Sequence, residues 1–456
     1  MNLTIKDIFQ AVGGKNEEIL QTEFSIEQVE FDTRKVVNNT LFIPLKGNRD
    51  GHEFIEQAFS MGACLTLSDR PLEVNVPYIL VEDTLKAFQE LAKFYLKKIN
   101  PKVCAITGSN GKTTTKDMTA SVLSTTFKTY KTQGNYNNEI GLPYTIMSID
   151  EQVEVLVLEM GMDRKGDIEL LTSIGQPDVA AITMIGESHI EHLGSRSGIA
   201  SAKMEIVSGL KKDGTLIVPE DEPLLKPLLK EVTQQVKTFG LTDEGDYLGA
   251  IVEETKNHTT FTVNRFKGEV FSIPVLGKYN VGNALIAMAV GEALGVPVEN
   301  IKQGLATFDL TKNRTEWLET KNGVQILSDV YNANPTAMKL VLDSFSKIKS
   351  QGRKIAVLGD MLELGPDSGK MHQSVGAHID PSQIDVVYLY GSEMKHLYAD
   401  LKGKYPEEKL AIYDTSEKEE MTKAIGQEIK SSDTVFLKAS NGMGLKEVVD
   451  NLLNNH

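Results

Sequence analysis

The segment TGSNGKTTT, at residues 107–115, has the residue types of a loop that binds nucleotide phosphates. Glycines let backbone N–H groups approach phosphate oxygens, Lys112 adds a positive charge, and a following hydroxyl such as that of Thr113 can bind magnesium. The general phosphate-loop pattern has another glycine five positions before Gly111, but Ile106 occupies that position. The sequence therefore predicts a shortened phosphate loop. Its predicted nucleotide ligands are Gly108, Ser109, Asn110, Gly111, Lys112, Thr113 and Thr114.

Other side chains that can bind metal follow apolar segments of the chain. Glu159 ends the segment VEVLVLE (153–159), where a carboxylate resembles the metal-binding acid of nucleotide hydrolases. The segment IGESHIEHLGS (185–195) follows another apolar run and contains His189 and His192. Each also has an ordinary explanation, because a glutamate at a strand end can simply be solvated and a histidine can be a loop or core residue.

These side chains meet only if the strands before them are neighbours in one parallel sheet. From residue 101 onward, apolar runs alternate with helix-like segments, which is typical of a mostly parallel sheet covered on both faces. The runs are KVCAIT (102–107), VEVLVLE, VAAITMI (179–185) and TLIVP (215–219). We therefore expect the phosphate loop, the acid and the histidines at one edge of this sheet.

The remaining segments differ from the central one in pattern. Residues 1 to about 98 mix short strands (41–45, 64–68 and 78–81) with helical stretches (52–62 and 84–98). After about residue 313 the alternation restarts with KIAVLGD, DVVYLY, KLAIYD and DTVFLKAS, as in an open doubly wound sheet. We expect an α/β protein with a small N-terminal unit (1–98), a central phosphate-loop domain (99–312) and a C-terminal Rossmann-like domain (313–456).

Composition excludes several classes of function. The chain has 456 residues, which suggests more than one domain, and a formal net charge of −15 with no Lys/Arg-rich run, which argues against a nucleic-acid partner. No apolar run approaches the roughly 18 residues of a membrane span, and the first residues lack a signal-peptide pattern, so we expect a cytoplasmic protein. The two cysteines, Cys64 and Cys104, have no metal-type spacing.

Six motifs in this order resemble those of the Mur ligase family of ATP-dependent amide ligases. They are TGSNGKTTT, KTQGNYNNEIGLP (131–143), LEMGM (158–162), IGESHIEHLGS, SAKMEI (201–206) and YNANP (331–335). Within the family, DVYNANPTAM followed by LGDMLELG (358–365) resembles the enzyme that adds D-alanyl-D-alanine to a UDP-N-acetylmuramoyl-tripeptide in peptidoglycan precursor synthesis. The resemblance covers the whole chain.

The resemblance implies a reaction, its cofactors and its partners. ATP would activate the tripeptide carboxylate as an acyl phosphate, with two Mg²⁺ ions, and the dipeptide amine would then displace phosphate. The substrates would be UDP-N-acetylmuramoyl-tripeptide and D-alanyl-D-alanine, and we expect a monomer. A sibling ligase that adds a single amino acid, or a folate-polyglutamylating relative, is the alternative, against which the YNANP and LGDMLELG segments count.

The resemblance also assigns roles to residues. Catalytic roles fall on Lys112, Lys203, His189 and Glu159, and metal ligation on Thr113, Glu159, His189 and Lys203. Further ATP contacts would be Asn280, Asn283, Arg314 and Asp329. Substrate contacts would be Thr33, Arg34, Lys46, Asp50, Gly51, His52, Asn135, Asn137, Asn138, Tyr331, Asn332, Asn334, Lys438 and Ser440. Lys203 matches a family lysine that is carbamylated by carbon dioxide.

Some positions keep a second interpretation or depart from the family pattern. Arg34 can equally be a surface charge, the asparagines of 135–138 can form a turn, and Lys438 can be a solvated strand end. Tyr279 stands where the family has a histidine, and Ser328 where an aspartate is often found. The sequence assigns neither the third residue of the tripeptide nor the general base for the amine.

Overall fold

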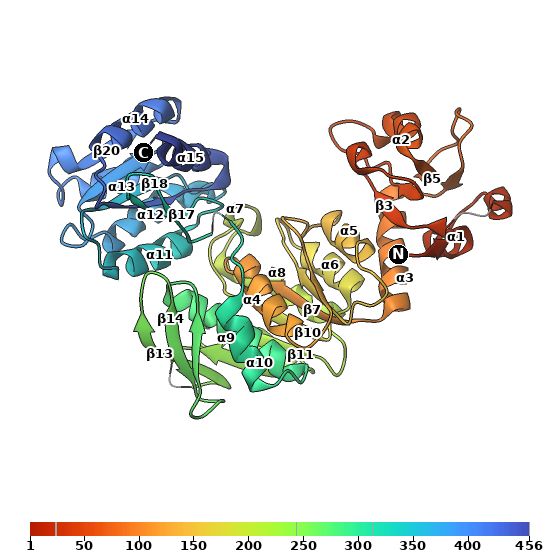
Figure 1. The fold of residues 1–456 in the computed structure, drawn as a ribbon, viewed down its shortest axis with the longest axis horizontal. Coiled ribbons are helices and arrows are strands. Elements are labelled where there is room, and N and C mark those ends of the chain that lie inside the picture. The colour runs from red at the N-terminus through yellow and green to blue at the C-terminus, as the bar shows by residue number, and fades with distance from the viewer. Residues whose placement is uncertain (23–24, 243, 313, 456) are drawn as a thin grey trace.

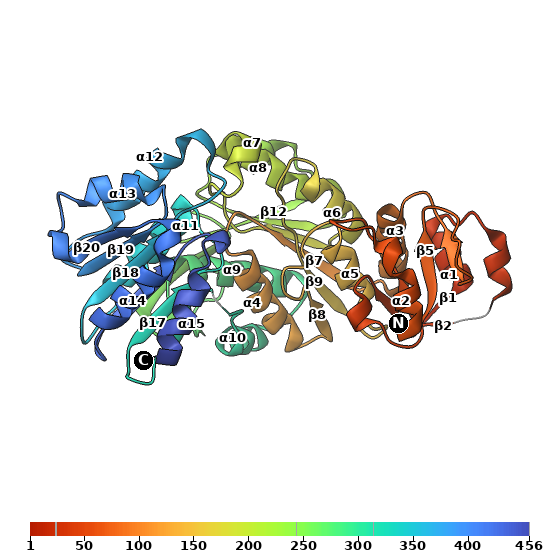
Figure 2. The same ribbon diagram turned by 90° about the horizontal axis from the view of Figure 1, so that it is seen from above.

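The computed structural model describes residues 1–22, 25–242, 244–312 and 314–455. Three main sheets follow one another along the chain, and the N-terminal and C-terminal parts lie at opposite ends of the long axis with the central part between them (Figures 1 and 2). The predicted C-terminal domain begins at residue 313 and ends at residue 456, and both of these residues lie outside the described ones.

The N-terminal part is a four-stranded parallel sheet in the order β3-β4-β5-β6. A separate antiparallel pair, β1 (Leu3–Thr4) and β2 (Ser25–Ile26), lies beside it. The strands are β3 (Gln28–Glu30), β4 (Thr40–Phe42), β5 (Ala63–Ser68) and β6 (Tyr78–Leu80), and the helices are α1 (Ile5–Val12), α2 (Ile55–Met61) and α3 (Thr84–Ile99). The three strands and two helical stretches expected from the sequence are therefore present.

The central part is a nine-stranded sheet in the order β15-β14-β13-β12-β11-β10-β7-β9-β8. Its parallel strands are β7 (Lys102–Thr107), β8 (Thr129–Lys131), β9 (Val155–Glu159), β10 (Val179–Ile182), β11 (Thr215–Pro219), β12 (Gln235–Gly240) and β13 (Tyr247–Glu254). The strands β14 (Thr259–Val263) and β15 (Val270–Ile273) extend it in antiparallel fashion. The mostly parallel sheet is confirmed, whereas the antiparallel extension was not anticipated from the sequence.

Helices cover both faces of the central sheet. Side chains that alternate along each strand therefore pack into two different cores, one on each face. Leu156 and Leu158 of β9 belong to one core, and Val155 and Val157 to the other. The first face carries α5 (Gly141–Met147), α6 (Asp167–Gly175) and α8 (Arg196–Met204), and the second carries α4 (Lys112–Ser124), α9 (Lys278–Ala293) and α10 (Val298–Thr307). The short helix α7 (Ile190–Leu193) lies beside the C-terminal part in both views (Figures 1 and 2).

The C-terminal part is a six-stranded sheet in the order β16-β17-β21-β18-β19-β20. The strands are β16 (Glu316–Glu319), β17 (Gln325–Asp329), β18 (Lys354–Gly359), β19 (Val386–Tyr390), β20 (Leu410–Tyr413) and β21 (Thr434–Lys438), of which only β16 is antiparallel to its neighbour. The helices are α11 (Pro335–Lys347), α12 (Ser368–Gln373), α13 (Met394–Leu401), α14 (Lys418–Glu428) and α15 (Leu445–Asn455). The predicted doubly wound sheet is confirmed.

Apolar packing joins the three parts. One continuous core runs from the N-terminal sheet through α3 into one face of the central sheet. Leu276 of the central part is buried in a core of the C-terminal part, which Ile190 and Tyr279 also contact. Among the described residues, no helix is both long and apolar enough to cross a membrane.

Candidate active site

The phosphate loop has the backbone geometry that its glycines predict. Gly108 has φ +152° and Gly111 has φ +80°, conformations that residues with a Cβ rarely adopt. A Cβ at Gly108 would lie 1.8 Å from Thr183 Oγ1, and one at Gly111 would lie 2.5 Å from Asn283 Oδ1. Only glycine fits at either position, so the loop passes close to its neighbours and presents its backbone at the N-terminus of α4.

Two cavities meet at this loop. The first, of 490 Å³, is mainly apolar and is lined by Phe239, Leu241 and α9 together with groups from the C-terminal part. The second, of 640 Å³, is mainly polar and contains Lys112, Thr113, Glu159 and His189. The residues that line both cavities are Asn110, Gly111, Arg314 and Asn332. The loop therefore separates an apolar site, which suits a nucleotide base, from a polar site, which suits an anionic substrate.

Glu159 is buried at the carboxyl end of β9, as the sequence predicts, and lines the polar cavity. Its Oε1 accepts a hydrogen bond of 2.9 Å from Asn137 Nδ2, and its Oε2 lies 3.8 Å from Lys116 Nζ. That Oε2 atom is buried without a hydrogen-bond partner. A buried carboxylate oxygen without a donor is a suitable ligand for a divalent cation, and Thr113 lines the same cavity.

His189 faces the polar cavity and meets a residue of the C-terminal part. Its Nδ1 lies 2.6 Å from Glu363 Oε2 and 3.4 Å from Asp163 Oδ1. Burial lowers the pKa of His189, and the two carboxylates oppose this shift, while Lys112 and Lys203 reinforce it. A histidine with a lowered pKa is neutral at physiological pH and can bind metal.

His192 is exposed on α7, away from both cavities. Of the two histidines in this segment, the structure brings only His189 to the phosphate loop. The sequence could not distinguish them, because both follow the same strand.

Lys203 is a buried lysine on α8, with 2% of its surface exposed. No hydrogen bond or ion pair joins its Nζ to any of the described residues. Burial lowers its pKa well below the ordinary value, and the charge of Lys112 lowers it further. The burial therefore excludes a solvated surface position for Lys203.

Arg314 and Asp329 bring the C-terminal part to the loop. The Arg314 guanidinium lies over the Tyr331 ring, 4.0 Å from its centroid, and its Nε is buried without a hydrogen-bond partner among the residues that the structure describes. Asp329 lines the apolar cavity and pairs with Lys438 Nζ, which also donates to Asn332 O at 2.9 Å. Lys438 is thus buried and paired at the apolar cavity. Its predicted contact with the substrate stays a prediction.

Asn280 and Asn283 support the loop through side-chain amides. Thr115 Oγ1 donates to Asn283 Oδ1 (3.1 Å), Asn283 Nδ2 donates to Asn280 Oδ1 (3.1 Å), and Asn280 Nδ2 donates to Leu276 O (2.8 Å). Both amides are thus engaged inside the protein, although both residues line the apolar cavity. Tyr279, which replaces the family histidine, lies 3.2 Å from Thr315 Oγ1 through its hydroxyl.

The structure also places the remaining residues that the sequence singled out in the C-terminal part. Asn334 caps α11, and Tyr331 and Asn332 line the polar cavity. Ser328 is fully buried with an unpartnered hydroxyl, and Ser440 Oγ accepts a hydrogen bond from Leu362 N (2.9 Å). Ser440 therefore holds the LGDMLELG segment in place.

The Asn-rich segment forms a turn beside the polar cavity, and its contact with a substrate stays a prediction. Asn135, Asn137 and Asn138 line the polar cavity. Asn138 Oδ1 also accepts hydrogen bonds from the N–H groups of Ile140 (3.3 Å) and Gly141 (2.9 Å), which is a side-chain turn.

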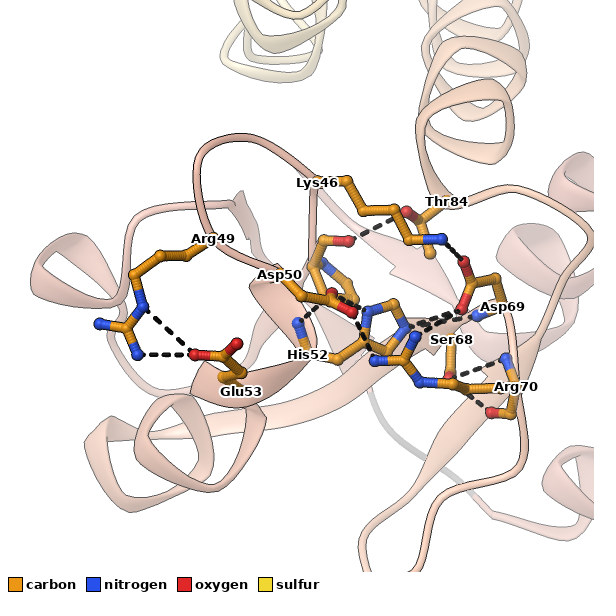
Figure 3. Close-up of polar contacts among 10 residues, drawn as sticks. Lys46, Arg49, Asp50, His52, Glu53, Ser68, Asp69, Arg70 and Thr84 are labelled. Atoms are coloured by element: carbon orange, nitrogen blue, oxygen red, sulfur yellow. Dashed lines mark hydrogen bonds and ion pairs between the residues drawn. The ribbon is translucent and has the colours of Figure 1, made fainter.

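The substrate contacts predicted in the N-terminal part lie elsewhere, in the loops after β3 and β4, and Asp69 and Arg70 follow β5 beside them. Figure 3 shows the His52 ring between Asp50 and Asp69, with Lys46 directed at Asp69 and Arg70 at Asp50. Gly51 packs against Leu45, where a Cβ would lie 2.5 Å from Leu45 O. This network fixes the 45–52 loop on the sheet.

Thr33 and Arg34 lie in the loop after β3. Arg34 has 85% of its side chain exposed and pairs with Asp32 at 2.7 Å. None of the six residues predicted here lines either cavity at the phosphate loop. Their contact with a nucleotide stays a prediction.

The Asp50 network is expected to contribute to stability in a pH-dependent way. Hydrogen bonds from Arg70 and from the backbone N–H of His52 lower the pKa of Asp50. A lowered folded-state pKa stabilises the protein above the unfolded pKa of about 3.9, and this contribution is lost as the pH falls through the folded pKa. We therefore expect Asp50→Asn to lower Tm by about 1–4 °C at pH 7 and by less at pH 3.

Thermal unfolding of the ligand-free protein at the two pH values measures this difference. Glu53→Gln is the control, because its pair with Arg49 is exposed on both sides. A Tm difference for Asp50→Asn that is equal at the two pH values would contradict the assignment.

Three residues at the site were not anticipated. Thr183 lies inside the run VAAITMI and directly follows the observed strand β10, and its Oγ1 donates to Asn110 O. Glu187 and Ser188 contact α11 of the C-terminal part. Thr183 was recognisable as a polar residue at a strand end, whereas nothing in the local sequence distinguishes Glu187 from a solvated loop acid.

Comparisons with known proteins agree with this geometry. Residues 106–291 match the family model of the Mur ligase middle domain, and residues 313–441 match that of the Mur ligase, glutamate ligase domain. The UDP-N-acetylmuramoyl-tripeptide--D-alanyl-D-alanine ligase of Bacillus subtilis (strain 168) is 43% identical over 454 residues, which cover 99% of this chain and 98% of the relative.

Solved structures of high similarity cover nearly the whole chain. MurF from Acinetobacter baumannii superimposes with a TM-score of 0.89 at 28% identity, covering 100% of this chain and 99% of that one. MurF ligase from Thermotoga maritima in complex with ADP gives a TM-score of 0.81 at 28% identity, covering 94% of this chain and 97% of that one.

Proposed function

Because the chain belongs to the Mur ligase family, we propose that it joins D-alanyl-D-alanine to a UDP-N-acetylmuramoyl-tripeptide with ATP, in peptidoglycan precursor synthesis. The Bacillus subtilis relative carries that activity in its name and matches this chain from end to end. Since ATP and the nucleotide precursor are cytoplasmic metabolites, we place the reaction in the cytoplasm.

The observation that carries the proposal is the meeting of two cavities at one phosphate loop. A ligase of this kind must bring the γ-phosphate of ATP to a carboxylate and then bring an amine to the resulting acyl phosphate. The apolar cavity suits the adenosine part of ATP, and the polar cavity suits the tripeptide carboxylate. A phosphate-loop hydrolase needs only the first of these.

The chain's own residues orient the first step. The loop N–H groups and Lys112 hold the phosphates, and Arg314 reaches them from the C-terminal part. A carboxylate oxygen of the tripeptide attacks the γ-phosphorus, the bond to the β–γ bridging oxygen breaks, and an acyl phosphate and ADP result. In the second step the amine nitrogen attacks the acyl carbon through a tetrahedral intermediate, loses a proton and displaces phosphate.

The residues of the polar cavity fit magnesium. Glu159 Oε2 is buried without a donor, His189 is neutral, and Thr113 lies at the start of α4. When bound, Mg²⁺ would offset the charge that develops between phosphate and carboxylate. Among the described residues, no group of three or more His, Cys, Asp or Glu could hold a metal ion, so beside waters and the phosphates of ATP a further anionic ligand from the chain would strengthen the site.

A carbamate on Lys203 would supply that ligand. A lysine amine attacks CO₂ only when neutral, and burial together with Lys112 favours the neutral form by lowering the pKa of Lys203. The product loses a proton and carries one negative charge shared by two oxygens, so a group that repels cations when protonated becomes one that binds them. The unpaired, buried position of Lys203 supports this modification.

The proposed domain roles follow the same arrangement. We assign the uridine nucleotide to residues 1–98, ATP to residues 99–312, and the closing groups Arg314 and Asp329, together with the dipeptide site, to residues 313–456. Glu363 of the C-terminal part pairs with His189, which lines the polar cavity, and we assign the entry of the dipeptide to the boundary between these two parts.

A coupled assay of ADP release tests the function. We expect turnover to require a UDP-N-acetylmuramoyl-tripeptide and D-alanyl-D-alanine together, and single amino acids to support less than about 1% of that rate, since a site built for a dipeptide leaves polar groups unpaired with a shorter substrate. Tripeptides ending in L-lysine and in meso-diaminopimelate should both be supplied, so that substrate choice does not hide activity.

Preference for a single amino acid would instead identify the protein as a sibling ligase. Turnover with a folate and glutamate in place of the muramoyl substrate would identify a polyglutamylating relative. Either result would overturn the proposed substrate.

A further inference from the structure

Two consecutive residues of the central part, Glu187 and Ser188, hold the first turn of α11 in the C-terminal part. Glu187 Oε2 accepts a hydrogen bond of 3.0 Å from Thr336 N, and its Oε1 accepts one of 2.9 Å from Thr336 Oγ1. Ser188 Oγ accepts a hydrogen bond of 2.7 Å from Asn334 Nδ2. These bonds cross between parts of the chain that are about 150 residues apart.

The contact completes a helix N-terminus. The first N–H groups of a helix lack partners within it, and this end of the helix is electrically positive. In α11, Asn334 Oδ1 accepts from Ala337 N at 2.9 Å, while the Thr336 N–H is satisfied by Glu187. The N-terminus of α11 is therefore capped partly by a side chain of the central part.

The same first turn touches the phosphate loop. Asn334, with 1% of its surface exposed, donates through Nδ2 to Asn110 Oδ1 at 3.0 Å. Ser188 Oγ in turn donates to Ser109 O at 3.2 Å. The start of α11 is thus tied directly to Asn110 and, through Ser188, to Ser109.

Arg196 lies beside Glu187 and pairs with its carboxylate. The Arg196 Nε lies 4.0 Å from Glu187 Oε1, and its NH2 group donates to Ile185 O (2.8 Å) and Glu222 Oε2 (2.9 Å). The largely buried carboxylate therefore faces one cation and one helix N-terminus, which offset the cost of its burial.

From these contacts we propose that Glu187 is a positioning residue for ligation, which locks the C-terminal domain onto the phosphate loop by capping α11 from the central domain. It touches no reacting group itself. It fixes the domain that carries Arg314 and Asp329 relative to Lys112. The kinetic consequence rests on the proposed function, whereas the contact itself does not.

Glu187→Ala, Glu187→Gln and Thr336→Val test the proposal. We expect Glu187→Ala to lower kcat/KM for ATP about tenfold or more with Tm changed by only a few degrees, because a charge-assisted bond between domains is lost without loss of core packing. Glu187→Gln keeps an oxygen acceptor and should recover part of the rate. The double variant Glu187→Ala/Thr336→Val should lose no more than Glu187→Ala, since both changes remove one contact.

Amide hydrogen exchange provides a readout that does not depend on the reaction. Glu187→Ala should speed exchange at Thr336 and at the neighbouring N–H groups of α11, with or without substrates. If the wild-type enzyme fails to ligate D-alanyl-D-alanine, the proposed function fails, but the exchange result still decides the contact.

Two control variants each remove a similar hydrogen bond that lies within a single domain. Glu154→Ala removes a carboxylate that accepts from Lys128 N (2.7 Å) at the opposite edge of the central sheet, and Thr422→Val removes a hydroxyl bonded to Lys418 O (2.7 Å) inside α14. Both should keep activity within about twofold. The proposal would be overturned by a wild-type kcat/KM in Glu187→Ala or by unchanged exchange in α11. It would also be overturned if the losses of rate in Glu187→Ala and Thr336→Val multiplied in the double variant.

Discussion

Replacement of Lys203 by alanine is expected to lower turnover at least about 100-fold while Tm changes by only a few degrees. Lys203 is buried but forms no hydrogen bond or ion pair with the described residues, so its removal breaks no polar contact of the fold. If Lys203 carries a carbamate, the change removes an anionic ligand of the metal, and even supporting residues of metal sites typically contribute 10- to 100-fold. Steady-state ligation and thermal unfolding measure the two effects.

A small carboxylate should partly restore the activity of Lys203→Ala, because acetate can place an oxygen where the carbamate stood. Wild-type protein equilibrated with ¹³C-labelled CO₂ should also show a carbamate carbon by NMR that Lys203→Ala lacks. Lys211→Ala, which removes a lysine paired with Asp178, is the matched control and should retain activity. Near-normal turnover of Lys203→Ala would refute the proposed role of this lysine.

Replacement of Lys112 by alanine is expected to abolish phosphoryl transfer, with a loss of about 1,000-fold or more, because positive groups that act on the transferring phosphate contribute on that scale. Lys112 Nζ donates to Gly108 O at 2.8 Å, which holds the ammonium over the loop. The side chain is half-buried and lines the polar cavity, so Tm should stay within a few degrees. ADP release in single-turnover experiments reports the chemical step directly.

Lys102→Ala is the control, which tests whether replacing any lysine of this strand and loop lowers turnover. Lys102 begins β7, at the other end of the strand that leads into the loop, and pairs with Asp178 on the surface. Its loss should leave turnover within about twofold. Substantial turnover in Lys112→Ala would contradict the assignment of the phosphate loop.

Features that depend on short stretches of sequence could be predicted. The glycines of the phosphate loop, the strand before it and Glu159 at the end of β9 are each encoded locally, and the structure places them as expected. The two faces of the central sheet also follow from apolar strands that alternate with helices.

Strand limits were less predictable where the backbone has a second use. The run VAAITMI suggested a strand to residue 185, but β10 ends at Ile182. The residues that follow support the phosphate loop instead, since Ser109 N donates to Met184 O at 2.9 Å. The antiparallel strands β14 and β15 were missed because a pattern that alternates strands and helices favours parallel connections.

Contacts between distant segments could not be read from one sequence. His189 meets Glu363 and Asn334 bonds to Asn110, and both pairs depend on how the domains pack. The environment of Lys203 is a similar case. Its burial is set by the packing of α8, whereas the sequence alone favours an exposed helix lysine.

The adjoining cavities have a consequence for ligand design. Cavities of 490 and 640 Å³ each fall in the range that holds a drug-sized molecule, and they share the wall formed by Asn110, Gly111, Arg314 and Asn332. Two weakly binding fragments joined by a short linker across that wall would each present the other at an effective concentration of roughly millimolar, which multiplies their affinities without any new contact. Because Arg314 and Asn332 come from the C-terminal part, such a molecule would select the arrangement in which the domains meet.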